Sequence, residues 1–343
     1  MRVAVLSGGR SSEHDVSIES AKSVIDGLEA GGHEVVSVVI DRDGVWHKAD
    51  PRSATAANGE PIAVVPGHGL LDAEVAFPVM HGPFGEDGTV QGLLESLGVA
   101  YVGSGVLGSS LCLDKAVFKR AMAQQGMPQV RYEVLHARDW RANRERCVRQ
   151  ASVLGFPQFV KPAQQGSSVG ISRVAASDDL EQALDTAFEH DPCVVAEASA
   201  SGIEIECSVI GNGRPKAFLP GEVVPAASHP FYDYEAKYTD PNGAALEAPA
   251  RLPAGTQERI MRLAEAAYEA VRCEGMARVD FFLGRGTDTV FLNEINTIPG
   301  FTSISMFPRM CEASGLPYGK LLDTLVELAL ERDRQRKSLR YER

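Results

Sequence analysis

The chain has 343 residues, 44% hydrophobic and 23% charged, which is enough for two or three globular domains with ordinary cores. Its 46 acidic and 34 basic residues give a formal net charge of −12, which argues against a nucleic-acid partner. The six cysteines are scattered without a C-x-x-C pair, so they indicate reduced core residues rather than disulfides or a zinc site. Only Val3–Leu6 is apolar at the N-terminus, and no run approaches the ~20 apolar residues of a membrane span. We therefore expect a cytoplasmic protein without a signal peptide or membrane contact.

The N-terminal pattern predicts a parallel sheet. An apolar strand at Val3–Leu6 is followed by a polar loop, a helix at Ile18–Leu28 and a second strand at Glu34–Ile40. Ligands of such sheets bind at the carboxyl ends of the strands. Glu13 lies in the first of these loops, where it could accept a hydrogen bond from a ligand ammonium or belong to the first turn of the helix. The sequence leaves both interpretations open.

A later strand of the same sheet ends in a second polar loop. The strand Val75–Met80 leads into His81 and then into a helix at Val90–Leu97. Because the two loops follow strands of one parallel sheet, we expect them to lie side by side. A functional and a structural role for His81 are equally compatible with this position. Residues 41–72 are predicted to form an insertion, partly strand and partly loop.

A glycine- and serine-rich loop marks a second sheet. The strand ending at Phe159–Pro162 includes Lys161, and a return strand at Ile171–Val174 follows the loop Ala163–Gly170. Exposed N–H groups, small side chains and one positive charge are what binding of phosphates requires. The G-K-[ST] motif of a P-loop is missing, and a strand follows where a P-loop has a helix. The pattern therefore predicts a hairpin lid over nucleotide phosphates.

For other candidate residues the local sequence leaves more than one role open. Lys115 follows the predicted helix cap Asp114, where it could bind a phosphate or lie at the surface. Residues Arg138–Leu154 are predicted to form one charged helical segment. The extended linker Glu197–Gly202 offers backbone groups to an adenine edge, and Glu204 could bind a ribose or be a surface charge at a strand end.

The C-terminal third contains a predicted hairpin with polar residues inside apolar strands. The apolar runs Ala277–Leu283 and Val290–Ile295 flank a turn. The polar residues are Arg278, Asp280, Glu294 and Asn296. Pairing Gly284 with Val290 places Asp280 opposite Glu294, and all four polar residues on one face. Two facing carboxylates need a positive partner, so a Mg²⁺–phosphate platform is predicted, the alternative being a solvated outer face of the hairpin.

Five motifs give these features a family resemblance. In chain order they are SSEHDVS (Ser11–Ser17), HGPFGEDGT (His81–Thr89), GSSVGIS (Gly166–Ser172), FYDYEAKY (Phe231–Tyr238) and NEINTIPGFTSIS (Asn293–Ser305). Over nearly its whole length the sequence resembles the D-alanine–D-alanine ligases of the ATP-grasp superfamily. The resemblance implies an α/β (α+β) protein, with an N-terminal Rossmann-like parallel-sheet domain followed by a two-domain ATP-grasp fold. The implied domains are residues 1–113, residues 114–212 with the lid hairpin, and residues 213–343 with a mobile loop and the Mg²⁺ hairpin.

The resemblance also implies a role for each residue at a motif position. The residues implied to bind ATP are Lys115, Lys161, Ser167, Ser168, Glu197, Ala198, Ala200, Glu204, Tyr232, Lys237 and Asn293. Those implied to hold two Mg²⁺ ions, which Mn²⁺ could replace, are Asp280, Glu294 and Asn296. The implied catalytic residues are Glu13, Ser167, Tyr238, Arg278 and Gly300. Those implied to bind the two D-alanines are Glu13, His81, Ser305 and Met306. The chain departs from the family pattern at Gln164–Gln165, before the lid glycine, where charged or aliphatic residues are more usual.

The implied activity is ATP-dependent ligation of two D-alanines through a D-alanyl phosphate, releasing ADP and phosphate, for peptidoglycan precursor synthesis. The implied assembly is a homodimer. Three alternatives remain. A D-alanine–D-lactate ligase is disfavoured by Tyr238, and another ATP-grasp carboxylate–amine ligase would lack FYDYEAKY. A nucleotide-binding regulator without turnover would have lost one of the four polar hairpin residues.

Overall fold

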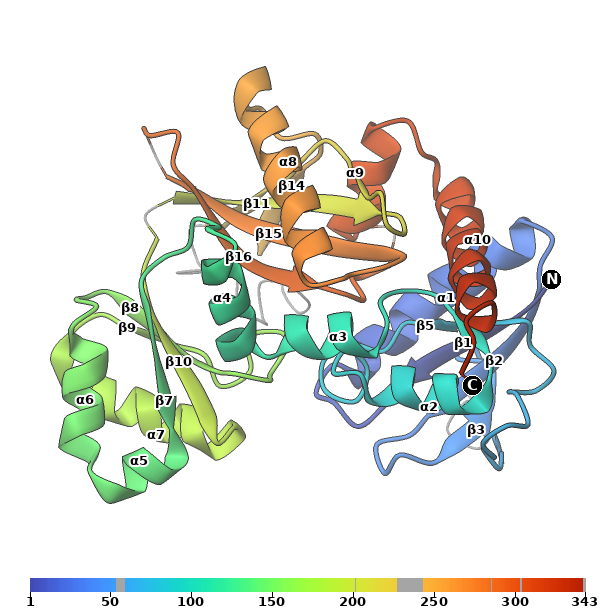
Figure 1. Ribbon diagram of the computed structural model, residues 1–343, viewed down its shortest axis with the longest axis horizontal. Coiled ribbons are helices and arrows are strands. Elements are labelled where there is room, and N and C mark those ends of the chain that lie inside the picture. Colours follow the sequence, from blue (N-terminus) through green and yellow to red (C-terminus); the bar gives the residue numbers. More distant parts are fainter. Residues whose placement is uncertain (54–58, 201, 227–242, 285, 303, 342–343) are drawn as a thin grey trace.

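The computed structural model describes residues 1–53, 59–200, 202–226, 243–284, 286–302 and 304–341. In this part of the chain the strands form three sheets, around which the helices are arranged (Figure 1). The α/β (α+β) class predicted from the sequence, with a parallel sheet at the N-terminus, is confirmed.

The first sheet has the strand order β4-β3-β2-β1-β5-β6. The strand β1 runs parallel to both β2 and β5, whereas β3 and β4 add an antiparallel edge. This edge comes from residues 41–72, which were predicted to be partly strand. The strands are β1 (Arg2–Gly8), β2 (Glu34–Ile40), β3 (Trp46–Lys48), β4 (Glu60–Pro61), β5 (Val75–Pro78) and β6 (Ala100–Tyr101).

Helices from both ends of the chain cover this sheet (Figure 1). The N-terminal helices are α1 (His14–Ala30) and α2 (Thr89–Leu97), and the C-terminal helix is α10 (Tyr318–Lys337). Leucines at 321, 322 and 325 of α10 are fully buried in one apolar core with Val3 and Phe77 of the sheet. Arg332 fixes the far end of α10, because its Nη2 donates to the Tyr101 carbonyl (2.6 Å) and its guanidinium lies 4.1 Å from the centroid of the Tyr101 ring.

The second sheet is antiparallel, with the strand order β7-β10-β8-β9. Its strands are β7 (Tyr132–His136), β8 (Gln158–Pro162), β9 (Ser172–Val174) and β10 (Cys193–Ala198). The helices before and around it are α3 (Val106–Leu113), α4 (Lys115–Gln124), α5 (Ala137–Ala142), α6 (Arg144–Ser152), a short 3-10 turn (Ser177–Asp179) and α7 (Leu180–His190).

The single helical segment predicted for Arg138–Leu154 is wrong, since the structure has two helices there. Asn143 has extended backbone between them, and its side-chain oxygen caps α6 by accepting from the N–H of Arg146 (2.9 Å). Arg144 then links α6 to α7 through Asp185 (2.8 Å) and Glu181 (3.2 Å).

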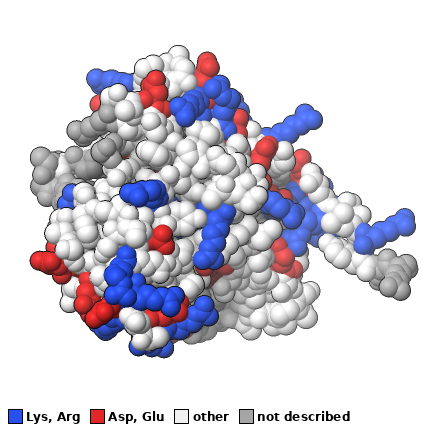
Figure 2. Space-filling model, turned by 60° about the vertical axis from the view of Figure 1, so that its left-hand side comes forward, with Lys and Arg blue, Asp and Glu red and all other residues white. Residues whose placement is uncertain are grey.

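On the face of the molecule seen in Figure 2, basic and acidic side chains are interspersed.

The third sheet has the order β14-β13-β11-β15-β16, with β12 paired to β11. Its strands are β11 (Gly202–Ile210), β12 (Lys216–Ala217), β13 (Gly221–Pro225), β14 (Ala244–Glu247), β15 (Met276–Gly284) and β16 (Val290–Asn296). Its helices are α8 (Ala254–Ala270) and α9 (Met306–Ala313).

The polar residues of the hairpin β15–β16 pair as predicted, but the residues next to its turn pair differently. Asp280 pairs with Glu294 as expected, whereas Val290 pairs with Leu283 and not with Gly284. A bulge next to Asp280 restores the register. It breaks the alternation of β16, so the consecutive residues Asn293 and Glu294 both line the cavity described below.

Candidate active site

A cavity of about 1180 Å³ lies where the three sheets meet. Its walls are the loops after β1 and β5, the loop between β8 and β9, the strands β11 and β16, and the segment after β16. The predicted site residues that line it are Glu13, His81, Lys115, Lys161, Ser167, Ser168, Glu197, Ala198, Ala200, Glu204, Arg278, Asn293, Glu294, Asn296, Gly300, Ser305 and Met306. The predicted residues Tyr232, Lys237 and Tyr238 lie outside the described residues. The structure thus brings the described candidates together, and Asp280, although not part of the lining, contacts the lining residues Arg278 and Asn296.

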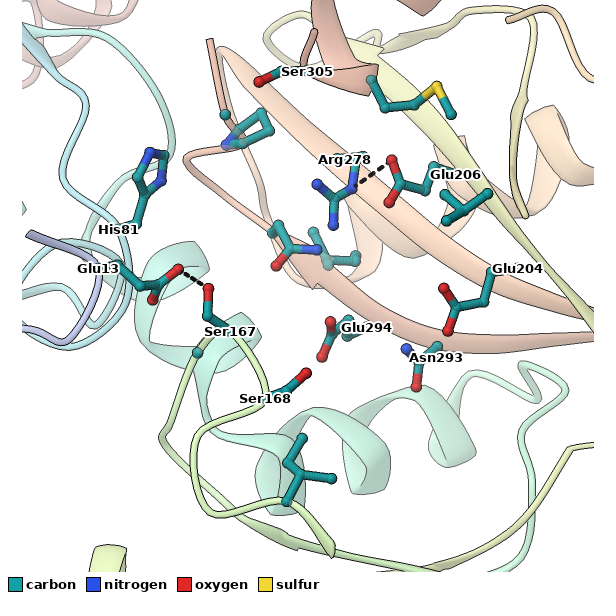
Figure 3. Close-up of a pocket in the computed structure, with 18 of the residues that line it drawn as sticks. Glu13, His81, Ser167, Ser168, Glu204, Glu206, Arg278, Asn293, Glu294 and Ser305 are labelled. Atoms are coloured by element: carbon teal, nitrogen blue, oxygen red, sulfur yellow. Dashed lines mark hydrogen bonds and ion pairs between the residues drawn. The ribbon is translucent and has the colours of Figure 1, made fainter. Parts of the chain in front are cut away.

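Glu13 connects the first sheet to the predicted lid loop. It precedes α1, but its side chain does not cap that helix. Instead its Oε1 accepts a hydrogen bond from the Ser167 hydroxyl (Figure 3). Its Oε2 is buried and has no hydrogen-bond partner among the described residues. A Cβ at Gly82 or at Gly166 would collide with Oε2, so the two glycines leave this oxygen the space it occupies. A buried polar oxygen without a hydrogen-bond donor is unfavourable, so this oxygen is one to which a ligand group can donate.

His81 uses both ring nitrogens to hold protein groups. Its Nδ1 donates to the carbonyl of Ile298 (2.9 Å), so its Nε2 accepts from the hydroxyl of Ser20 (3.2 Å). Burial lowers the pKa of His81, although the nearby charge of Glu13 opposes that shift. The lowered pKa favours the neutral ring, which holds the backbone two residues before Gly300.

Buried charged side chains form another part of the cavity wall. Lys115 donates from Nζ to the carbonyl of Gln165 at the base of the lid loop (2.6 Å), and Lys161 donates to Glu197 Oε2 (2.8 Å). Burial lowers the pKa of Lys115. Burial opposes ionisation of Glu197, but the adjacent lysines Lys119 and Lys161 lower its pKa to about 2. The result is a group of ionised side chains beside a polar loop, as anion binding requires.

The loop between β8 and β9 has an unusual backbone. Ser167 and Ser168 have φ values of 45° and 63°, in the left-handed region that residues other than glycine rarely occupy. Such conformations are retained where the surrounding structure requires them, and they cluster at binding sites. At the base of the loop, the unusual residue Gln164 donates from Nε2 to Asp114 (3.0 Å), and Gln165 donates to the carbonyl of His190 (3.3 Å). These glutamines anchor the loop to α4 and α7.

The predicted metal residues fit a hard cation by their chemistry. Glu294 and Asn296 line the cavity. Asp280 accepts from Arg278 through both oxygens (Nε–Oδ1 2.8 Å, Nη2–Oδ2 2.7 Å) and from the Asn296 amide nitrogen (2.8 Å). The positive group beside Asp280 is thus the Arg278 guanidinium. Because the Asn296 nitrogen is committed to Asp280, its carbonyl oxygen is the atom left for a cation. Among the described residues no group of three or more His, Cys, Asp or Glu side chains forms a metal cluster.

Comparison with known proteins identifies the family. Models of the N-terminal and C-terminal parts of D-ala D-ala ligases match residues 2–104 and 121–327. A D-alanine–D-alanine ligase of Solibacter usitatus is 48% identical over 344 residues, covering 100% of this chain and 99% of the relative. The chain belongs to the D-alanine–D-alanine ligase family. A D-alanine–D-alanine ligase A of Bradyrhizobium diazoefficiens is 47% identical and covers 99% of this chain and 97% of the relative.

Solved structures of the family have the same fold. The D-alanine–D-alanine ligase of Coxiella burnetii superposes with a TM-score of 0.87 at 36% identity, covering 98% of this chain and 96% of that one. The VanG D-Ala:D-Ser ligase of Enterococcus faecalis gives 0.84 at 32% identity, covering 96% and 99%. The expected ATP-grasp fold is therefore confirmed, and the chain is an enzyme of the ligase class. The domain boundaries and the residue roles remain predictions.

Three residues of the site region were given no role from the sequence. Glu86 accepts from the backbone N–H groups of Gly82 and Ile298, and Glu206 contacts the Nε of Arg278 (3.2 Å; Figure 3). Lys119 contacts Glu197. Glu86 lies inside a quoted motif, and Lys119 follows Lys115 by one helical turn, a spacing that places both on one helix face. No described helix is both long and apolar enough to cross a membrane.

Proposed function

We propose that the protein joins two D-alanine molecules into D-alanyl-D-alanine, with ATP as the energy source, for peptidoglycan precursor synthesis. One observation carries the proposal: a single cavity contains both the buried Oε2 of Glu13, which has no hydrogen-bond partner among the described residues, and the buried lysines Lys115 and Lys161. The first suits the ammonium of an amino acid, and the second suits the phosphates of a nucleotide.

The nucleotide occupies the side formed by the second and third sheets. Glu197, Ala198 and Ala200 receive the adenine, and Glu204 binds the ribose. The lysines and the loop residues Ser167, through its backbone, and Ser168 bind phosphates, together with Asn293 from the bulge of β16. From family resemblance we add Tyr232 and Lys237 to this group.

The two D-alanines occupy the side formed by the first sheet and the segment after β16. Glu13 takes the ammonium of the first D-alanine, while His81 acts by holding Ile298. Ser305 and Met306, at the start of α9, bind the second D-alanine. Arg278 and the N–H of Gly300 stabilise the developing oxyanion, and family resemblance adds Tyr238.

The chemistry requires activation of a carboxylate, which is a poor electrophile. One carboxylate oxygen of the first D-alanine attacks the γ-phosphorus of ATP, forming D-alanyl phosphate and ADP. The neutral amine of the second D-alanine attacks the carbonyl carbon and forms the peptide bond. Phosphate leaves with the electrons of the single bond between the carbonyl carbon and the phosphate oxygen, and the new peptide nitrogen releases one proton to solvent. The protein supplies position and charge stabilisation for these steps. Mg²⁺, held by Glu294, Asn296 and Asp280, would neutralise phosphate charge when bound. By family resemblance we place the enzyme in the cytoplasm as a homodimer.

The test is ATP-dependent phosphate release with a panel of D- and L-amino acids and D-lactate, with products identified by mass. We expect D-alanyl-D-alanine as the main product, with one phosphate released per peptide bond. D-Serine belongs in the panel because a structural relative is a D-Ala:D-Ser ligase. If the main product contains D-lactate or D-serine, that compound replaces D-alanine as the proposed second substrate. If the protein binds D-alanine but releases no phosphate from ATP and forms no product, the proposed ligase activity is overturned.

A further inference from the structure

A buried group of three charges lies at the nucleotide end of the cavity. Glu197 is contacted through Oε1 by Lys119 Nζ (3.2 Å) and through Oε2 by Lys161 Nζ (2.8 Å). The side chains of Lys119 and Glu197 are 2% and 3% exposed, and that of Lys161 is 11% exposed. Burial lowers the pKa of Lys119, and the charge of Glu197 opposes that shift; with both lysines protonated, the group carries one positive charge in excess.

The two lysines differ in their access to the cavity. Lys161 and Glu197 line it, whereas Lys119 lies behind Glu197 on α4 and does not. Tyr132 lies next to Lys119, with 5.4 Å between Nζ and the ring centroid. Lys119 therefore cannot reach a bound nucleotide from this position, although it carries its charge at the same end of the site.

We propose that Lys119 is a positioning residue for nucleotide binding: it keeps Glu197 paired and in place so that Lys161 can turn its ammonium to the nucleotide phosphates. The inference rests on the proposed use of ATP. A buried charge that loses its partner is strongly unfavourable. If Lys161 were the only partner of Glu197, moving it to a phosphate would leave that carboxylate buried and unpaired. With Lys119 behind it, Glu197 keeps one partner and the excess positive charge is available to the ligand.

The experiment measures binding of a non-hydrolysable ATP analogue with Mg²⁺ by calorimetry, together with KM for ATP and for D-alanine. Lys119→Met keeps most of the buried stem and removes the charge. We expect it to weaken analogue binding and raise KM for ATP by at least ~10-fold, with KM for D-alanine within about 2-fold, because one lost charge contact commonly costs a factor of ten or more. Lys119→Arg restores a positive charge and should recover part of the affinity. Arg120→Met, at the next and exposed position of α4, is the matched control and should bind normally.

A double-mutant comparison separates this role from a general effect on the fold. In the Glu197→Gln background there is no carboxylate to balance, so adding Lys119→Met should leave analogue affinity unchanged or improve it. The same loss in both backgrounds would overturn the proposal, as would normal analogue binding by folded Lys119→Met. Should Lys119→Met fail to fold, the smaller loss expected for Lys119→Arg replaces it, and a loss of analogue affinity on adding Lys119→Met to Glu197→Gln would still overturn the proposal. If the parent enzyme neither binds the analogue nor makes the dipeptide, the proposed function itself is refuted. If the parent enzyme is active and Lys119→Met binds the analogue normally, only the role proposed for Lys119 is refuted.

Discussion

Glu86 accepts a hydrogen bond from the backbone N–H of Ile298, 212 residues further along the chain (Oε1···N 2.8 Å). Its other oxygen accepts from the N–H of Gly82 (2.9 Å). The carbonyl of Ile298 accepts from His81, so both backbone groups of this residue are held by the loop after β5. The segment that carries Gly300 is therefore fixed to the first sheet and not only to its own hairpin.

The burial of Glu86 predicts a pH-dependent contribution to stability. Burial, and then the charge of Glu13, raises the pKa of Glu86 from 4.5 to about 7. A carboxyl group with a higher pKa in the folded state stabilises the fold below its unfolded pKa and loses that contribution as the pH rises through the folded value. We expect the stability of the parent relative to Glu86→Gln to fall between pH 4.5 and pH 7, measured as the difference in urea midpoints.

The control for this prediction is Glu327→Gln, at an exposed position of α10. Its stability difference from the parent should stay constant over the same pH range. A difference for Glu86→Gln that is constant, or that grows with pH, would show that Glu86 is ionised at least as easily in the fold as in the unfolded chain.

Neighbouring serines of the lid loop should affect different substrates. The Ser167 hydroxyl donates to Glu13, whereas the Ser168 side chain points into the cavity toward Glu294 (Figure 3). A hydrogen bond to a charged group contributes roughly 1.5–3 kcal/mol, so we expect Ser167→Ala to raise KM for D-alanine by about 10-fold or more. Ser168→Ala should instead raise KM for ATP. Both constants are measured with the other substrate saturating, and the reverse pattern would exchange the two assignments.

The sequence predicts the hairpin and its facing carboxylates because strand alternation and turn composition are local properties. It does not fix the pairing at the bulge that turns both Asn293 and Glu294 toward the cavity, although two consecutive polar residues between the buried Leu292 and Ile295 break the strand alternation there. The break at Asn143 was missed because the charged residues around it favour a helix on either side.

Contacts between distant residues had no local signature. Lys119 is separated from Glu197 by most of the second sheet's sequence, and nothing near either residue indicates an ion pair. The contacts of Glu86 and of Arg332 likewise join parts of the chain that only the complete fold brings together. Position within a motif predicted which residues line the cavity, but not which of them hold one another.

We expect activity to require glycine at position 166 of the lid loop, because any side chain there would meet Glu13. A Cβ at Gly166 would collide with Glu13 Oε2 and lie 3.4 Å from the Cα of Gly82. Since the backbone of Gly166 is not in the left-handed region, the effect of Gly166→Ala should be steric and confined to the site. We expect kcat/KM for D-alanine to fall by at least ~10-fold, the change that about 1.4 kcal/mol produces, with little change in Tm.

The matched control is Gly319→Ala, where the added methyl meets open space in the first turn of α10. It should keep full activity, and alanine should stabilise that helix by up to ~1 kcal/mol. Equal activity of Gly166→Ala and Gly319→Ala would mean that the loop moves away from Glu13 during turnover.

The most direct test of the metal-binding residues is Glu294→Gln. The substitution keeps the shape of the side chain and removes one negative charge from a position that faces Asp280 across the hairpin and lines the cavity. Losing one electrostatic stabiliser of the transition state typically costs ~10²-fold or more in turnover, so phosphate release should fall by at least that factor. The fold should survive, because the side chain is only partly buried and a neutral amide relieves repulsion between the two carboxylates.

The Glu294→Gln variant should also need more Mg²⁺ for half-maximal activity, which is measured by titrating the metal at fixed ATP. Glu258→Gln, exposed on α8, provides the control with the same chemical change away from the site. Near-normal phosphate release and an unchanged Mg²⁺ requirement in folded Glu294→Gln would remove Glu294 from the metal site and leave Arg278 as the positive group that the facing carboxylates require.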